Sequence, residues 1–148
     1  MSLANSPAPS LVLDTQTWLG VVEGRGDLIG RTARIAIERS ARNGALLVAA
    51  ISVWEVAMLV AWGRITLAMS VDEWVAASLR PPGLRLVPLD AEIAIDSVRL
   101  PDFADHEDPA DRMIIATARR EGALVTTDAT ILAWAARHGH LRTIDARP

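Results

Sequence analysis

Cysteine, lysine and tyrosine are absent from this sequence of 148 residues, and phenylalanine occurs once. Without cysteine the chain has no disulfide, no thiolate nucleophile, no cysteine-ligated zinc and no iron–sulfur cluster. Without lysine it has no P-loop and no Schiff-base site, because all 15 cationic side chains are arginine. No apolar run approaches the roughly 18 residues that span a membrane. No secretory signal is visible either, and together with the lack of cysteine this favours the cytoplasm.

Apolar residues, by contrast, make up 51% of the chain, and the mean hydropathy is +0.24. This is enough apolar material for one core, so we expect a single domain over residues 11–148 behind a flexible polar lead of residues 1–10. The formal net charge is −3, which excludes a long-range field that attracts nucleic acid. Any contact with RNA therefore needs local arginines or a bound cation.

Short apolar runs alternate with helical segments along the chain. We expect strands at 11–13, 45–51, 84–89, 123–127 and 141–144, and helices at 27–42, 52–62, 71–79, 91–99, 108–120 and 130–138. Apolar strands separated by helices predict an α/β fold, in which a parallel sheet is covered by helices on both faces. Ligands of such sheets bind beyond the carboxyl ends of the strands.

Four of the expected strands finish at an aspartate, namely Asp14, Asp90, Asp128 and Asp145. Taken alone, each of the first three is best explained as the N-cap of a following helix. Asp145 has no helix after it and is interpreted as a terminal charge. These aspartates become informative only when they are considered together with the acids of the predicted helices.

Glu55 lies in an almost wholly apolar helix, where an ionised carboxylate is costly to bury. Ser52 and Glu55 have the spacing of a capping box, and Ile51 with Val56 could form the accompanying staple. A carboxylate in the first turn also lies near the carboxyl edge of the sheet. Both interpretations of Glu55 stay open at this point.

A second helix begins in an acidic stretch. Asp108 is a good N-cap, Pro109 suits the first helical position, and Asp111 falls in the first turn. The surrounding acids, Asp102, Asp105 and Glu107, are typical of a solvated loop. Capping and solvation therefore explain much of this stretch.

Asp14, Glu55, Asp111 and Asp128 nevertheless all belong near the same edge of one sheet. Several carboxylates within a few Å repel one another unless some stay protonated or a cation lies between them. Mg²⁺ or Mn²⁺ takes oxygen ligands and keeps several waters. Such a site favours phosphate chemistry, because the cation neutralises a phosphodiester oxygen and lowers the pKa of a water for in-line attack.

The chain resembles the PIN-domain ribonucleases of the VapC type, which are the toxins of bacterial type II toxin–antitoxin pairs. The resemblance extends from Leu11 to Asp145. It is carried by Leu-Val-Leu-Asp14-Thr15, by Ile51-Ser52-Val53-Trp54-Glu55, by His106-Glu107-Asp108-Pro109-Ala110-Asp111-Arg112 and by Leu124-Val125-Thr126-Thr127-Asp128. The block from His106 to Arg112, in its order relative to the other acids, is the specific part.

The resemblance implies a single PIN-like α/β domain that cleaves RNA with Mg²⁺ or Mn²⁺ and leaves 5′-phosphate and 3′-hydroxyl ends. It implies Asp14, Glu55, Asp111 and Asp128 as the catalytic and metal-binding residues, with Asp108, Thr126 and Thr127 as candidate helpers. It also implies a homodimer and an antitoxin protein whose tail covers the site. Gln16 stands where close relatives often carry His or Asn, and this departure bears on the substrate.

Arg112, Arg119 and Arg120 are candidates for positioning RNA because they follow the acidic helix start, although a solvated helix face explains each of them as well. Trp54, Met58 and Trp62 share one helical face; we expect Trp54 in the core and leave Trp62 open between core and interface.

Two other functions remain open: a non-catalytic PIN scaffold that acts through protein binding, and another Mg²⁺-dependent phosphohydrolase. A phosphatase of the haloacid dehalogenase type is disfavoured, because it needs an aspartate where this chain has Gln16 and a lysine that the chain lacks.

Overall fold

The computed structural model describes residues 9–80, 83–103 and 106–148. The lead predicted for residues 1–10 therefore lies outside the described residues as far as residue 8, as does Asp105 of the acidic stretch. The elements are β1 (Leu11–Leu13), α1 (Thr15–Val22), the 3-10 helix η2 (Gly26–Leu28), α2 (Arg31–Arg42), β2 (Leu46–Ala49), α3 (Ala50–Ala61), α4 (Val71–Ser78), β3 (Leu84–Val87), α5 (Ala91–Val98), α6 (Pro109–Glu121), β4 (Ala123–Thr126), α7 (Ala129–His138) and β5 (Arg142–Asp145).

All five strands of the described sheet are parallel, in the order β3-β2-β1-β4-β5. The central strand β1 pairs with β2 on one side and β4 on the other, so that Leu13 is in register with both Val48 and Val125. The chain thus builds the sheet outward from β1 in both directions. A crevice forms at such a switch point beyond the carboxyl ends of the strands, and Asp14 is the residue that follows β1.

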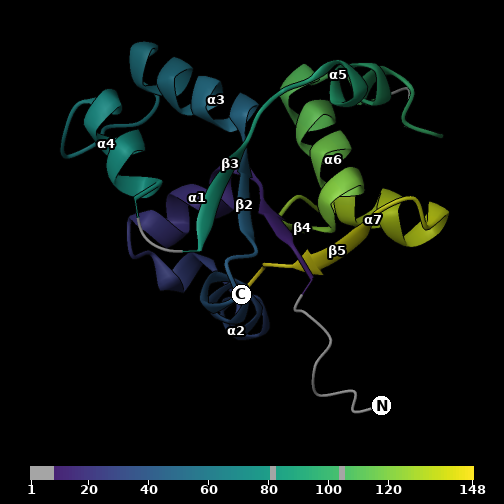
Figure 1. The fold of residues 1–148 in the computed structure, drawn as a ribbon, viewed down its shortest axis with the longest axis horizontal. Helices are drawn as coiled ribbons and strands as arrows, with labels where there is room; N and C mark the ends of the chain where they lie inside the picture. The colour runs from purple at the N-terminus through teal and green to yellow at the C-terminus, as the bar shows by residue number, and fades with distance from the viewer. Residues whose placement is uncertain (1–8, 81–82, 104–105) are drawn as a thin grey trace.

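Helices cover both faces of the sheet (Figure 1). An apolar core lies on each face, because successive strand residues point to opposite faces. Val12 contributes to the core beneath α5, α6 and α7, where Trp134 is fully buried. Leu11 and Leu13 contribute to the other core, together with Trp18 of α1 and Trp74 of α4. The predicted α/β fold with helices on both faces is confirmed.

Several boundaries differ from the prediction. Helix α1 was absent from the expected helices, although the N-cap interpretation of Asp14 implied a helix after it. The helix predicted from residue 27 begins at Arg31 after η2, and α3 begins at Ala50 within the predicted second strand. The expectation that Trp54 lies in the core is wrong, since its exposed fraction is 54%. Helix α3 buries only Ser52 and Val56, one turn apart, which places Trp54 on the opposite side.

Trp62, at the C-terminal end of α3, is 66% exposed. Each helix in the described part of the chain is too short or too polar to cross a membrane.

Candidate functional site

Asp14 connects the central strand to two neighbouring elements. Its Oδ1 atom accepts a hydrogen bond from the Thr17 backbone N–H at 2.8 Å and so caps α1. Its Oδ2 atom accepts a hydrogen bond from the hydroxyl of Thr126, which is the last residue of β4 and is fully buried. The same Thr126 oxygen accepts the backbone N–H of Asp128 at 3.0 Å. One threonine thereby holds the ends of β1 and β4 together.

Asp128 follows β4 and caps α7. Its Oδ1 atom accepts the backbone N–H groups of Thr130 at 2.8 Å and Ile131 at 3.0 Å. Of the two candidate threonines, Thr126 therefore makes the contact that joins Asp14 to Asp128, whereas Thr127 is half-buried beside it. N-capping, expected for both aspartates when taken alone, is confirmed.

Glu55 reaches this edge from the second turn of α3. Its Oε1 atom accepts a hydrogen bond from the Thr15 hydroxyl at 2.6 Å, and Thr15 Oγ1 lies 3.0 Å from Ser52 Oγ. The capping-box interpretation of Ser52 and Glu55 is wrong, because α3 begins at Ala50 with Ala49 as a cap that makes no side-chain hydrogen bond. The two side chains instead meet Thr15 of a neighbouring helix.

Burial raises the pKa of Glu55 above its ordinary value, while the hydrogen bond from Thr15 opposes the rise. Repulsion from the negative charges of Asp111, Asp108 and Asp14 adds to the effect on the Glu55 pKa. Glu55 is therefore within electrostatic reach of acids that lie in two other parts of the chain.

Asp111 lies in the first turn of α6, which Asp108 caps by accepting the Asp111 N–H at 3.1 Å. Its Oδ2 atom lies 2.8 Å from Nε2 of His106. Burial raises the pKa of Asp111, the hydrogen bond with His106 lowers it, and the charges of Asp108 and Asp128 raise it further. Asp111 thus interacts electrostatically with Glu55 of α3 and with Asp128, which caps α7.

The structure brings all four predicted carboxylates, with Asp108 beside them, to one edge of the sheet. In the described residues, no three Asp, Glu or His side chains are close enough to form a ready-made metal cage. Mg²⁺ does not need such a cage, since it keeps several waters and is held by one or two carboxylates together with substrate phosphates. A purely oxygen-based donor set in which neighbouring charges help to raise the pKa of Glu55 and Asp111 fits a hydrated divalent cation.

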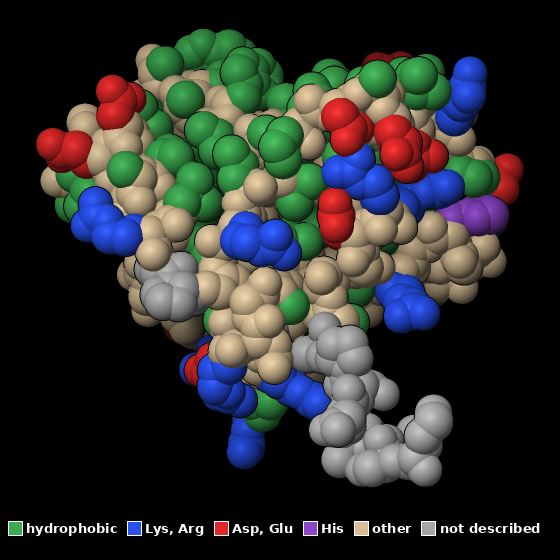
Figure 2. Space-filling view, viewed as in Figure 1, with side chains coloured by type: hydrophobic (Ala, Val, Ile, Leu, Met, Phe, Trp, Pro, Cys, Tyr) green, Lys and Arg blue, Asp and Glu red, His purple; other side chains and the backbone are tan. Residues whose placement is uncertain are grey.

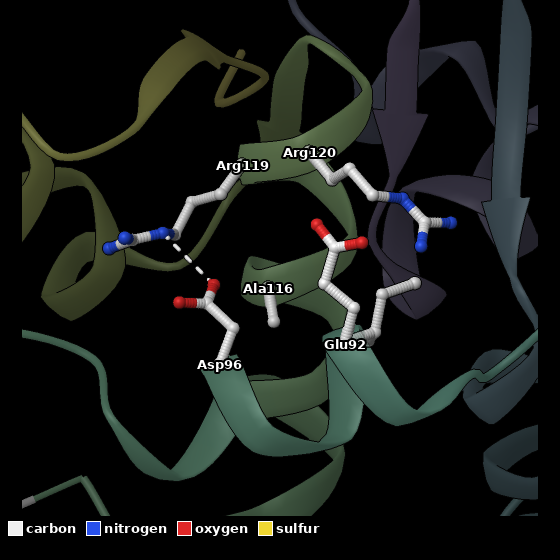
Figure 3. A pocket seen from close by; sticks show the side chains of 6 residues that line it. Glu92, Asp96, Ala116, Arg119 and Arg120 are labelled. Atoms are coloured by element: carbon white, nitrogen blue, oxygen red, sulfur yellow. Dashed lines mark ion pairs between the residues drawn. The ribbon is translucent and has the colours of Figure 1, made fainter.

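Arg119 and Arg120 lie at the other end of α6, near its C-terminus. Arg119 Nε is 3.1 Å from Asp96 Oδ2, and Arg120 pairs with Asp90 and Glu121. Together with α5 they line a cavity of about 250 Å³ (Figure 3). Both guanidinium groups are thus paired with carboxylates. They lie at the opposite end of this 13-residue helix from Asp111, which is in its first turn.

Arg112 has different partners. Its guanidinium donates hydrogen bonds to backbone carbonyls that precede α6, including those of Phe103 at 2.5 Å and His106 at 2.9 Å. The sequence interpretation missed this contact, and it also missed Thr15 and His106 as neighbours of the acids. The available signal was the position of His106 and Arg112 on either side of Asp111 in one short motif.

A model of the PIN domain family matches residues 11–137. The chain belongs to the PIN domain family. Membership was expected from the resemblance of several sequence motifs to those of the family and is confirmed, and the five-stranded parallel sheet is that of a PIN domain. A comparison with curated proteins finds no match.

Solved structures similar to this PIN domain include DNA-bound VapBC from Salmonella typhimurium (20% identity, 93% of this chain and 98% of that chain covered, TM-score 0.61). They also include DNA-bound VapBC2 from Rickettsia felis (14%, 91% and 97%, 0.65) and a toxin–antitoxin complex from Klebsiella pneumoniae (20%, 84% and 91%, 0.55). At these identities the similarity concerns the fold.

Proposed function

We propose that this PIN-domain protein is a metal-dependent endoribonuclease and the toxin of a bacterial toxin–antitoxin pair. The observation that supports this proposal is that Asp14, Glu55, Asp111 and Asp128 all lie at the switch point of the sheet. Burial and neighbouring charges there raise the pKa of Glu55 and Asp111. The similar folds of proteins solved as VapBC complexes support the toxin assignment.

The four carboxylates are the residues that would hold Mg²⁺ or Mn²⁺, which when bound neutralises a phosphodiester oxygen and favours attack by water. Asp14 is fixed by Thr126 and by the N-terminus of α1. Thr15 holds Oε1 of Glu55, which leaves Oε2 to ligate the cation or to orient water. Hydrolysis joins the water oxygen to phosphorus, breaks the bond to the 3′ oxygen and transfers a proton to that oxygen.

The test is cleavage of a structured RNA by the full chain, with Mg²⁺, with Mn²⁺ and with EDTA. We expect cleavage only with a divalent cation, and we expect Asp14→Asn to abolish it. Asparagine also caps helices well, so the variant keeps its fold. Asp72→Asn changes an exposed acid on α4 and is the matched control, expected to cleave as the wild type does. Normal cleavage by Asp14→Asn, or cleavage in EDTA, would contradict the proposal.

A non-catalytic scaffold makes a different prediction. Only an intact acid cluster gains stability from the ion through binding to the folded state. We expect Mn²⁺ to raise the Tm of the wild type and to leave that of Asp14→Asn unchanged. An equal response from both proteins would argue against the metal site, and a metal response without RNA cleavage would favour the scaffold or another phosphohydrolase.

We further propose that the protein acts in the cytoplasm as a homodimer and binds an antitoxin that covers the site. The surface of α3 and α5 supports such contacts: Trp54, Trp62, Ile95 and Val98 are each at least half exposed, and Figure 2 shows hydrophobic side chains gathered over the upper part of the molecule. Exposed apolar patches of this kind mark protein interfaces. Sedimentation of Trp62→Ser tests the dimer, which we expect to weaken.

A further inference from the structure

The segment between α5 and α6 carries His106 to the acid cluster, and backbone carbonyls of this segment and of the last turn of α5 converge on one side chain. Arg112 Nε donates to Ser97 O at 2.8 Å, Nη1 to Phe103 O at 2.5 Å and to His106 O at 2.9 Å, and Nη2 to Val98 O at 3.3 Å. A planar guanidinium with donors on three nitrogens can satisfy carbonyls spread around it, whereas a lysine presents a single point of charge.

The aromatic side chains hold the same segment from the core side. The Phe103 ring packs at 4.6 Å from that of Trp134, and the Trp134 indole N–H donates to Pro101 O at 2.7 Å. The Arg112 guanidinium lies 5.9 Å from the Phe103 ring centroid. Backbone and side chain of Phe103 are thus both fixed, and Phe103 is buried.

His106 is placed by these contacts. Its carbonyl binds Arg112, and its ring stacks on Phe103 with centroids 4.6 Å apart and an interplanar angle of 8°. In that position Nε2 lies 2.8 Å from Asp111 Oδ2. A continuous set of contacts therefore runs from Arg112 to the Asp111 carboxylate through His106, although Arg112 and Asp111 are adjacent in the sequence.

We propose that Arg112 is a positioning residue: by fixing the backbone of Phe103 and His106, it makes His106 hold the Asp111 carboxylate in the orientation that binds the divalent cation. This inference rests on the proposed function. Residues that orient a metal-binding carboxylate typically change metal affinity 10- to 100-fold when they are replaced. The alternatives are a contact between Arg112 and RNA phosphates, or a purely structural role.

The test is the Kd of Mn²⁺ for the full chain without RNA, measured by titration calorimetry or by the electron paramagnetic resonance signal of free Mn²⁺. We expect Arg112→Lys and His106→Leu each to weaken Mn²⁺ binding by about 10- to 100-fold. His106→Gln keeps an N–H donor at a similar reach and should restore affinity to within about threefold of the wild type. Ile37→Val, in the opposite core, controls for a loss of stability that is unrelated to the site.

The double variant distinguishes transmission through His106 from independent effects. If Arg112 acts through His106, the double variant with Arg112→Lys and His106→Leu binds Mn²⁺ no more weakly than the single variant that has the lower Mn²⁺ affinity. Additive losses would overturn the proposal. So would unchanged Mn²⁺ affinity in Arg112→Lys with a raised KM for RNA, which would indicate a phosphate contact. So would affinity that falls equally in Ile37→Val, which would indicate a structural role.

Failure of the proposed function gives a separate result. Wild-type protein that binds Mn²⁺ but leaves RNA intact contradicts the ribonuclease assignment, while the Mn²⁺ affinities of the variants still report on positioning. RNA cleavage and Mn²⁺ binding at wild-type levels in Arg112→Lys contradict positioning and leave the ribonuclease assignment standing. Wild-type protein that binds no Mn²⁺ overturns both.

Discussion

Replacement of Thr126 by valine tests the link between the first and fourth strands. Thr126 is fully buried, donates to Asp14 Oδ2 and accepts the Asp128 N–H. Valine has nearly the same shape, so the change removes both hydrogen bonds without leaving a cavity. A hydrogen bond to a charged group contributes about 1.5–3 kcal/mol, and an unsatisfied buried N–H costs about 1–3 kcal/mol. We therefore expect Thr126→Val to lower the free energy of unfolding by roughly 2.5–6 kcal/mol.

Thr126→Ser is the matched control for the hydroxyl. It keeps both hydrogen bonds and loses one buried methyl group, which corresponds to about 1 kcal/mol. Thr127→Val changes the adjacent half-buried threonine and should matter less than either variant. The measurement is urea denaturation in EDTA, followed by circular dichroism, with the midpoint compared at constant m. A Thr126→Val protein at least as stable as Thr126→Ser would refute the reasoning.

Two further predictions concern the acids. Because the pKa of Glu55 is raised in the folded protein, the native state binds this proton more tightly than the unfolded chain does. The unfolding free energy of the metal-free protein should therefore fall as the pH rises from the ordinary pKa of 4.5 through the raised pKa of the folded state. Glu55→Gln should lessen that fall. The measurement is urea unfolding of this variant over a pH series, and a pH dependence equal to that of the wild type would contradict the prediction. Asp128→Ala should cost about 1 kcal/mol, because it removes the cap of α7, whereas Asp128→Ser keeps a capping oxygen. Both Asp128 variants should lose metal-dependent RNA cleavage, and an active serine variant would show that the carboxylate acts only as a cap.

The parallel sheet could be predicted from the sequence because short apolar runs alternate with helical segments, and parallel strands bring their carboxyl ends to one edge. Helix α1 could not. Thr15 and Thr17 are β-branched and Gly20 weakens a helix, so local propensity is poor. The helix forms because Asp14 caps it and because Trp18 packs edge-on against Trp74, with ring centroids 4.9 Å apart.

At the candidate site, sequence reasoning placed the four acids near one edge of the sheet and missed the side chains that contact them. The Ser52–Glu55 spacing predicted a cap, but the local signal was overridden by contacts with Thr15, which lies 37 residues before Ser52. Arg112 was a candidate for positioning RNA, with a solvated helix face as the alternative; its contacts were missed because its hydrogen-bond partners are backbone carbonyls whose positions depend on the fold. The signal along the chain is confined to the position of His106 and Arg112 on either side of Asp111.

The hydrogen bond between Thr126 and Asp14 joins residues 112 positions apart. A ribosome must therefore synthesise most of the polypeptide before this edge of the sheet can form, because β4 is the strand that brings Asp128 beside Asp14. Shorter nascent chains hold only Asp14, Glu55 and, late in synthesis, Asp111. Under the function proposed above, all four carboxylates are therefore present only after β4 has been synthesised.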